Sequence, residues 1–239
     1  MRRIMLLVAA TALTLLAASG VALAATISCD GGLCVGTDKQ DTMTGSPHRD
    51  IMKGLAGDDS LMAHARADTL VGGTGNDRLG GQGGNDRLVG NGGFDREDGY
   101  VGEDVILGGP GFDDLSGGEN RDVVKGGPDA DYLKSGAGND TMYSGSGGGH
   151  MSGGGGGDTI YGGAGTDYVY GDIARSDTGV GGEDTIDVSD GDAGDSVDCG
   201  PGTDTVYVDT QAADGQANDA IDSYVNCERV REGDAPNSP

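Results

Sequence analysis

Residues 72–116 read GGTGNDRLG, GQGGNDRLV, GNGGFDRED, GYVGEDVIL and GGPGFDDLS when they are written in blocks of nine. Every block opens with Gly and carries Gly at its fourth and Asp at its sixth position. All blocks except the third have an aliphatic residue at the eighth position. A fixed period of this kind is typical of a repeat architecture, in which each unit is stable only when it stacks on its neighbours.

The same period extends over fifteen units from residue 36 to residue 170 without an insertion. The sixth position is Asp in every unit except the one that contains Gly149, and the eighth is apolar except at Glu97. The aspartates are Asp41, Asp50, Asp59, Asp68, Asp77, Asp86, Asp95, Asp104, Asp113, Asp122, Asp131, Asp140, Asp158 and Asp167. Two independent columns that stay in phase over this length exclude a flexible glycine-rich linker.

This pattern is the nonapeptide G-G-x-G-x-D-x-U-x, so the chain resembles the RTX, or haemolysin-type, calcium-binding family. The resemblance implies an all-β fold, a parallel β-roll (a β-solenoid) of nonapeptide repeats. The glycines allow tight turns, and the last three residues of each unit form a short strand with only its middle side chain inward. Two units complete one coil of eighteen residues, so strands of alternate units stack in one parallel sheet.

The turns carry the expected chemistry. A carboxylate and several backbone carbonyls at fixed spacing form an all-oxygen site, which suits Ca²⁺ better than Mg²⁺. The resemblance implies that each ion is shared by units one coil apart, for example by Asp77 with Asp95, Asp95 with Asp113, and Asp86 with Asp104. The expected metal-site residues are Asp59, Gly72, Gly73, Gly75, Asp77, Gly81, Gly84, Asp86, Gly90, Gly93, Asp95, Gly99, Gly102, Asp104, Gly108, Gly109, Gly111, Asp113, Asp122, Asp131, Asp140, Asp158 and Asp167.

Several units depart from the pattern. The fourth-position Gly is replaced by Lys39, His48, Arg66, Asn120 and Asp129, and a cation at that position should repel calcium. Gly149 removes the acid from two of the shared pairs. Glu97 either points into the core as a buried acid, which is costly, or marks a local bulge of the coil.

The composition agrees with a fold that depends on bound cations. The chain has 50 Gly, no Trp, two Phe and a formal net charge of -25. Large side chains are too scarce for a conventional two-layer core, and such an acidic chain stays disordered unless something else stabilises it. The charge also argues against binding to nucleic acid or to anionic membrane surfaces.

The first 24 residues have the features of a secretory signal peptide. Arg2 and Arg3 precede an almost wholly apolar run, and Ala22-Leu23-Ala24 provides a small-x-small cleavage site. An uncleaved membrane anchor is the alternative, but the apolar run is short. We therefore expect a secreted, extracellular protein with no membrane span after cleavage.

The expected division is a signal peptide at 1–24, an N-terminal cap at 25–35, the β-roll at 36–170, and an irregular acidic C-terminal cap and tail at 171–239.

Four cysteines, Cys29, Cys34, Cys199 and Cys227, allow three disulfide pairings. The expected one is local, Cys29 with Cys34 and Cys199 with Cys227, because a long rigid solenoid holds its ends apart. Disulfide-bearing end caps follow from this pairing. A zinc site is the alternative, although no His lies near either pair.

No enzyme is expected, because the chain lacks HExxH, GxSxG and GxxxxGK[ST], and its three histidines have no ligand spacing. The leading hypothesis is an exported β-roll that folds on binding calcium between repeat turns. The alternative is a calcium-stiffened surface adhesion or matrix protein that binds a partner through its outer sheet face. Tyr143 and Tyr161, one coil apart, would belong to that face.

Overall fold

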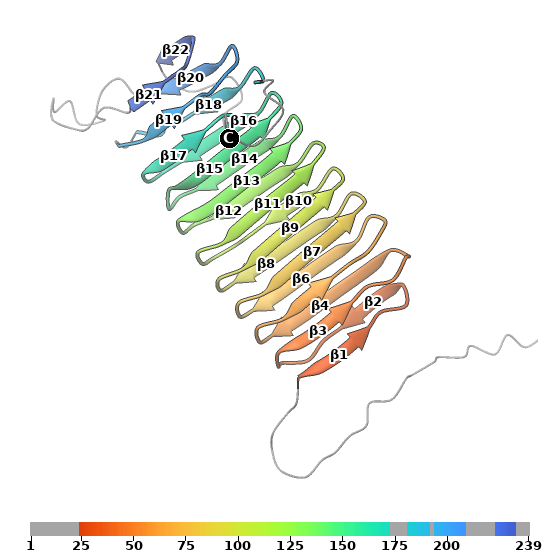
Figure 1. The fold of residues 1–239 in the computed structure, drawn as a ribbon. Coiled ribbons are helices and arrows are strands. Elements are labelled where there is room, and N and C mark those ends of the chain that lie inside the picture. The colour runs from red at the N-terminus through yellow and green to blue at the C-terminus, as the bar shows by residue number, and fades with distance from the viewer. Residues whose placement is uncertain (1–23, 173–180, 192–193, 209–222, 233–239) are drawn as a thin grey trace, which may run out of the picture.

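The computed structural model describes residues 24–172, 181–191, 194–208 and 223–232. In this part of the chain the fold is a rod of stacked coils made of strands and turns, with no helix (Figure 1). The strands form two parallel sheets of 11 strands each, and consecutive strands alternate between the two sheets.

The sheet of odd-numbered strands is called the odd sheet here. It consists of β1 (Ala25–Ser28), β3 (Asp41–Thr44), β5 (Ser60–Met62), β7 (Arg78–Gly83), β9 (Arg96–Val101), β11 (Asp114–Glu119), β13 (Asp131–Ala137), β15 (Gly149–Gly155), β17 (Asp167–Tyr170), β19 (Ser196–Asp198) and β21 (Ser223–Val225).

The even sheet lies on the opposite side of the coil. It consists of β2 (Gly32–Val35), β4 (Asp50–Ala56), β6 (Thr69–Thr74), β8 (Arg87–Gly92), β10 (Val105–Leu107), β12 (Val123–Gly127), β14 (Thr141–Gly145), β16 (Thr159–Gly163), β18 (Thr185–Asp187), β20 (Thr205–Val208) and β22 (Arg229–Glu232).

The register of the sheets confirms the predicted β-roll. Arg78 of β7 pairs with Arg96 of β9, and Arg96 pairs with Asp114 of β11, so one coil takes eighteen residues. Each unit therefore places its strand directly over the strand two units earlier. Equivalent positions of the repeat form straight columns along the rod, and any side chain that recurs in the sequence recurs as a column in space.

The core is the column of eighth-position side chains from both sheets. Fourteen of the fifteen units contribute one apolar residue that is fully or almost fully buried. These residues are Met43, Met52, Leu61, Leu70, Leu79, Leu88, Ile106, Leu115, Val124, Leu133, Met142, Met151, Ile160 and Val169. A unit that buries one side chain is not stable alone, so stacking supplies the stability of the rod.

Glu97 occupies the remaining core position. It pairs in register with Leu79 on one side and with Leu115 on the other, and 1% of its surface is exposed. The expectation of a local bulge is therefore wrong, and the expectation of a buried acid is confirmed. The uninterrupted pairing of β7, β9 and β11 holds the backbone of Glu97 in the same geometry as that of the neighbouring leucines.

Both ends of the rod carry a disulfide bond. Cys29 is bonded to Cys34 and Cys199 to Cys227, which confirms the predicted local pairing.

The sheets include β1 and β2 before residue 36, and β18 to β22 after residue 170. The division into caps and a central roll stays a prediction, and residues 1–23 of the expected signal peptide lie outside the described residues. No helix with the length and apolarity to cross a membrane occurs in the described part of the chain.

Candidate metal centre

The sixth-position aspartates form two columns inside the turns, one at the start of each sheet's strands. All fourteen that the sequence predicted are buried, with at most 2% of their surface exposed. Asp77, Asp95 and Asp113 follow one another along the odd sheet, and Asp86 and Asp104 along the even sheet. The structure thus brings together the pairs that the resemblance implied.

Most of these aspartates accept, through Oδ1, the backbone N–H of the column residue in the preceding coil. The backbone N–H of Asp77 donates to Oδ1 of Asp95 at 2.8 Å, and the N–H of Asp95 donates to Oδ1 of Asp113 at 2.8 Å. On the even sheet the same bond links Asp86 to Asp104 at 2.6 Å. These bonds form two ladders that run parallel to the axis of the rod.

The two ladders differ in continuity. The even ladder passes from Asp50 through every coil to Asp204, whose N–H donates to Oε2 of Glu228 at 2.8 Å. The odd ladder is continuous from Ala25 to Asp131. It stops there because the residue one coil further is Gly149, which offers no carboxylate.

Oδ2 of Asp41 accepts the N–H of Thr37, and Oδ2 of Asp50 accepts the N–H of Ser46. In most of the other column aspartates the second carboxylate oxygen is buried and has no hydrogen-bond partner in the described structure. This holds for Oδ2 of Asp59, Asp68, Asp77, Asp86, Asp95, Asp104, Asp113, Asp122, Asp131, Asp158, Asp184 and Asp204. A buried carboxylate oxygen without a partner costs free energy, because it has given up its hydration. A column of such oxygens therefore points to a ligand that satisfies them.

The first-position glycines make room for these oxygens. A Cβ on Gly81 would overlap Oδ2 of Asp86 and lie 2.9 Å from the carbonyl oxygen of Gly99. A Cβ on Gly99 would likewise overlap Oδ2 of Asp104 and lie 2.5 Å from the carbonyl oxygen of Gly117. Oδ2 and a carbonyl oxygen of the next coil thus converge beside the predicted site residues Gly81, Gly90 and Gly99, whereas the nearest atoms to a Cβ on Gly72 or Gly108 all belong to Asp77 or Asp113.

The other predicted glycines shape the turn. Gly73, Gly75, Gly84, Gly93, Gly102, Gly109 and Gly111 all have positive φ. A Cβ on Gly75 would also overlap the carbonyl oxygen of Gly57 in the preceding coil. Arg66 and Asn120, which replace the fourth-position glycine, adopt φ values of 88° and 81°. These two units therefore keep the left-handed conformation at that position, although it is unfavourable for their side chains, whereas Lys39, His48 and Asp129 do not have positive φ.

Burial raises the pKa of the column carboxyls from Asp59 to Asp158, and of Asp184 and Asp204 in the tail. Desolvation is the largest cause, and neighbouring carboxylates raise the pKa further, while the N–H from the preceding coil lowers it. The pKa reaches about 6 for Asp77, about 7 for Asp86 and about 8 for Asp122 and Asp158. For Glu97, burial followed by the charges of nearby aspartates raises the pKa well above its usual range. A divalent cation would favour the ionised form of all these groups.

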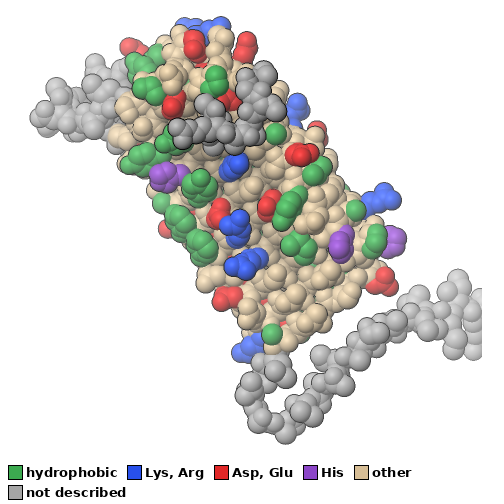
Figure 2. Space-filling view, viewed as in Figure 1, with side chains coloured by type: hydrophobic (Ala, Val, Ile, Leu, Met, Phe, Trp, Pro, Cys, Tyr) green, Lys and Arg blue, Asp and Glu red, His purple; other side chains and the backbone are tan. Residues whose placement is uncertain are grey.

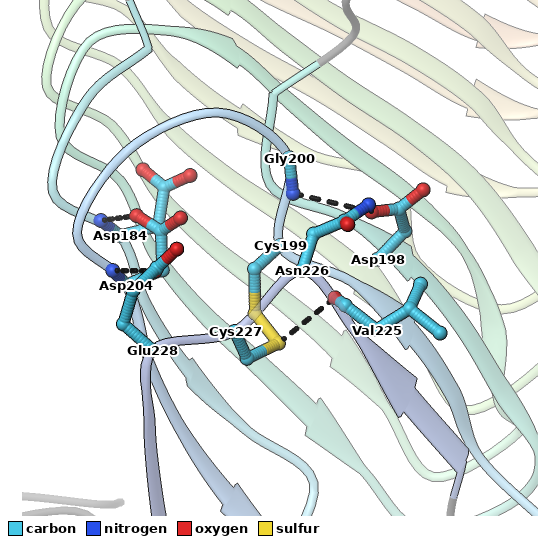
Figure 3. Close-up of a disulfide and its surroundings, with 9 residues drawn as sticks. All are labelled: Asp184, Asp198, Cys199, Gly200, Asp204, Val225, Asn226, Cys227 and Glu228. Atoms are coloured by element: carbon cyan, nitrogen blue, oxygen red, sulfur yellow. Dashed lines mark hydrogen bonds between the residues drawn. A yellow bond between two sulfur atoms is a disulfide. The ribbon is translucent and has the colours of Figure 1, made fainter.

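The columns continue into the tail, where the sequence analysis assigned no metal ligands. Asp184 and Asp204 extend the even column, as Figure 3 shows beside the Cys199–Cys227 disulfide, and Asp195 extends the odd column. Each precedes an inward aliphatic residue by two positions, namely Ile186, Val206 and Val197. That Asp-x-aliphatic spacing is the signal that could have found them.

One further acid near the C-terminal end comes from outside the columns. Carboxylate oxygens of Asp167, Asp190 and Asp195 all lie within 4.8 Å of one another. Asp190 is exposed and lies outside the nine-residue register, so the period could not reveal it. Carboxylate and carbonyl oxygens alone, as in the columns and in this group, are the donors that hard cations such as Ca²⁺ prefer.

Comparison with known families agrees with this chemistry. A model of the RTX calcium-binding nonapeptide repeat matches residues 35–61, 62–97, 98–133, 116–151 and 143–173, which together span more than half of the chain. A search of curated proteins found no significant match. The period, the parallel β-roll, the buried aspartate columns and this match together show that the chain belongs to the RTX calcium-binding nonapeptide repeat family.

Proposed function

We propose that this protein is an exported calcium-binding β-roll that folds when calcium ions bind between the turns of neighbouring coils. The observation that supports it best is the column of buried Oδ2 atoms without hydrogen-bond partners in the described structure, several of them beside a backbone carbonyl oxygen of the next coil. The proposed ligands are the column aspartates and the carbonyl oxygens of the glycine turns named above.

The coupling of calcium binding to folding follows from charge and burial. A chain with a net charge of -25 must bring its carboxylates together in the turns, where they repel one another. Bound calcium removes that repulsion and stabilises only the folded state, so binding energy becomes folding energy. Two disulfide bonds are typical of an oxidising compartment, and they support the proposed export through the N-terminal signal peptide.

A calorimetric titration of the full chain with calcium and with magnesium tests this function. The informative variant is Asp104→Asn, which keeps an acceptor for the N–H of Asp86 but removes the charge of one column position. The matched control is Glu103→Gln, an exposed neighbour in the same turn that loses the same charge. We expect calcium to bind more tightly than magnesium, and Asp104→Asn alone to weaken binding. Unchanged binding by Asp104→Asn, or no binding to the unaltered chain, would contradict the proposal.

A second candidate function is the binding of a surface or matrix partner through the outer sheet faces. On the even sheet the rings of Tyr143 and Tyr161 stack with centroids 4.9 Å apart, and Nζ of Lys125 lies 4.4 Å from the ring centroid of Tyr143. On the odd sheet His150 stacks on Tyr168 with ring centroids 4.7 Å apart, and Tyr132 lies on its other side with its ring tilted by 33°. Figure 2 shows such hydrophobic side chains interspersed with charged ones on the visible face.

This second function predicts a different result from a different experiment. The variant Tyr132→Ser/Tyr168→Ser removes two exposed rings from a sheet face, whereas Phe94→Ser/Phe112→Ser removes a stacked pair from the turns. If a sheet face binds a partner, the tyrosine variant loses attachment to the surface of the producing cells and the phenylalanine variant keeps it. Equal attachment of both calcium-loaded variants and the unaltered protein would rule this face out.

A further inference from the structure

Glu97 is the one position at which a charged side chain enters the hydrophobic column of the described repeats. Its neighbours in the odd sheet are Leu79 and Leu115. Both of its carboxylate oxygens are buried and make no hydrogen bond of normal geometry in the described structure, although the backbone N–H of Gly90 is close enough to lower the pKa of Glu97 slightly against the effect of burial. An acid placed among leucines destabilises a fold unless something compensates it. The structure shows where that compensation would come from.

The carboxylate of Glu97 lies beside the turn of its own unit. Glu97 and Asp95 are two residues apart at the start of β9, so both side chains point inward while Arg96 points outward. A Cβ built on Gly90 would overlap Oδ2 of Asp95 and would lie 2.8 Å from Oε1 of Glu97. The same point is 2.8 Å from the carbonyl oxygen of Gly108. Oxygens from two carboxylates and one carbonyl therefore converge beside Gly90.

The equivalent places in neighbouring units are poorer in oxygen. Beside Gly81 and beside Gly99, the nearest groups are one aspartate and one carbonyl oxygen of the next coil. The core residues of those units, Leu88 and Ile106, contribute none. The space beside Gly90 therefore has one more carboxylate than the spaces beside Gly81 and Gly99. That additional carboxylate comes from the core position of the unit.

We propose that Glu97 is a direct cation ligand that completes, with Asp95 and the carbonyl of Gly108, the strongest divalent-cation site of the rod. The inference rests on the proposed calcium function and assigns a role to a residue outside the repeat pattern. Higher ligand charge raises the affinity of an oxygen site for calcium. The site lies in the middle of the best-formed units, and its proposed ligands come from both sheets. Asp95 and Glu97 lie at the start of β9 in the odd sheet, and Gly108 directly follows β10 in the even sheet.

Two substitutions at this position distinguish whether Glu97 is a cation ligand or a buried neutral acid. Glu97→Gln keeps the shape of the side chain and removes its charge, and Glu97→Leu restores the residue type of the rest of the column. Glu119→Gln is the control, because it removes an exposed charge of the adjacent strand β11. The calcium concentration at the midpoint of folding, followed by circular dichroism, and the affinity of the tightest ions, followed by chelator competition, are measured for each full-length variant.

If Glu97 binds the ion, Glu97→Gln and Glu97→Leu both raise the calcium midpoint and weaken the tightest class of sites by about tenfold. Glu119→Gln leaves both quantities near those of the unaltered protein. If Glu97 is only a buried neutral acid, Glu97→Leu lowers the calcium midpoint because it removes an unfavourable group from the core, and this result overturns the inference. Unaltered protein that binds no calcium would instead refute the proposed function itself.

Discussion

Each column aspartate has two separate roles that can be assigned to its two carboxylate oxygens. Oδ1 of Asp95 accepts the backbone N–H of Asp77 and so fixes the spacing of two coils. Oδ2 of Asp95 has no hydrogen-bond partner among the described residues and lies beside Gly90, close to the carbonyl oxygen of Gly108. The same side chain therefore contributes to the stacking of the rod and to the proposed ion site, and a substitution at such a residue affects both.

The first-position glycines lead to a prediction about the effect of adding a methyl group at these positions. Gly99→Ala introduces a Cβ that overlaps Oδ2 of Asp104, whereas a Cβ on Gly92 would have its nearest neighbour 4.0 Å away. We expect Gly99→Ala to destabilise the calcium-loaded protein by about 1–3 kcal/mol, the usual range for overpacking, and to weaken calcium binding. Gly92→Ala should change either quantity little. Chemical unfolding in calcium checks this, and equal effects of the two variants would show that Oδ2 is not confined by Gly99.

The raised pKa values give a prediction about pH. Burial raises the pKa of Asp77 to about 6, of Asp86 to about 7 and of Asp122 to about 8, all above the value of about 4 in an unfolded chain. The calcium-free folded state therefore holds more protons than the unfolded state. Its stability is greatest at low pH and falls as the pH rises through these values.

Protein freed of calcium on a chelating resin should accordingly show more β-structure by circular dichroism at pH 5 than at pH 8. Calcium should reverse this order, because its ligands must be deprotonated. Calcium-free protein with less β-structure at pH 5 than at pH 8 would show that burial does not control these carboxyls.

At the scale of the element, the unit of residues 144–152 is the one repeat that lacks the column acid. Gly149 leaves the N–H of Asp131 without the carboxylate that the other coils of the repeat offer, and Ser144 replaces the first-position glycine of the same unit. The hydroxyl of Ser144 lies 2.8 Å from the point where a Cβ of residue 149 would be. The serine thus occupies space beside the place of the missing aspartate.

Restoring both residues should complete the odd ladder. We expect the double variant Ser144→Gly/Gly149→Asp to bind more calcium than the unaltered chain, because Asp131 and Asp167 would gain a partner between them. Gly149→Asp alone should gain less, since its side chain must compete with the hydroxyl of Ser144. Titration calorimetry measures the number of calcium ions bound per chain and so distinguishes the single from the double variant. An unchanged number in the double variant would mean that carbonyl oxygens already complete this site.

The strands and the column residues differ in how far the sequence could predict them. The strands and the core from residue 36 to 170 were predictable because no insertion disturbs the period. Beyond that, the distance between successive column aspartates becomes 26, 20 and 28 residues, so counting in nines missed Asp184, Asp195 and Asp204 as column members. Asp190 has no place in the period at all. For Glu97 the sequence allowed two conformations, and only the strand register decided between them.

The whole molecule is a one-dimensional stack with little apolar material. Its core is a narrow column of side chains, mostly one for each unit, between two columns of buried acids. Each coil adds both a small hydrophobic gain and a set of unsatisfied carboxylates, so lengthening the rod does not by itself make the calcium-free form stable. Under this account, calcium supplies the free energy that the core of an ordinary globular domain would supply.

Far-UV circular dichroism of the full mature chain at pH 8, first in EDTA and then with increasing calcium, tests this dependence most directly. We expect a spectrum typical of a disordered chain in EDTA, and a cooperative change to a β-sheet spectrum as calcium is added. Magnesium at the same concentrations should produce much less change. A β-sheet spectrum that is already complete in EDTA and does not respond to calcium would show that folding does not depend on calcium.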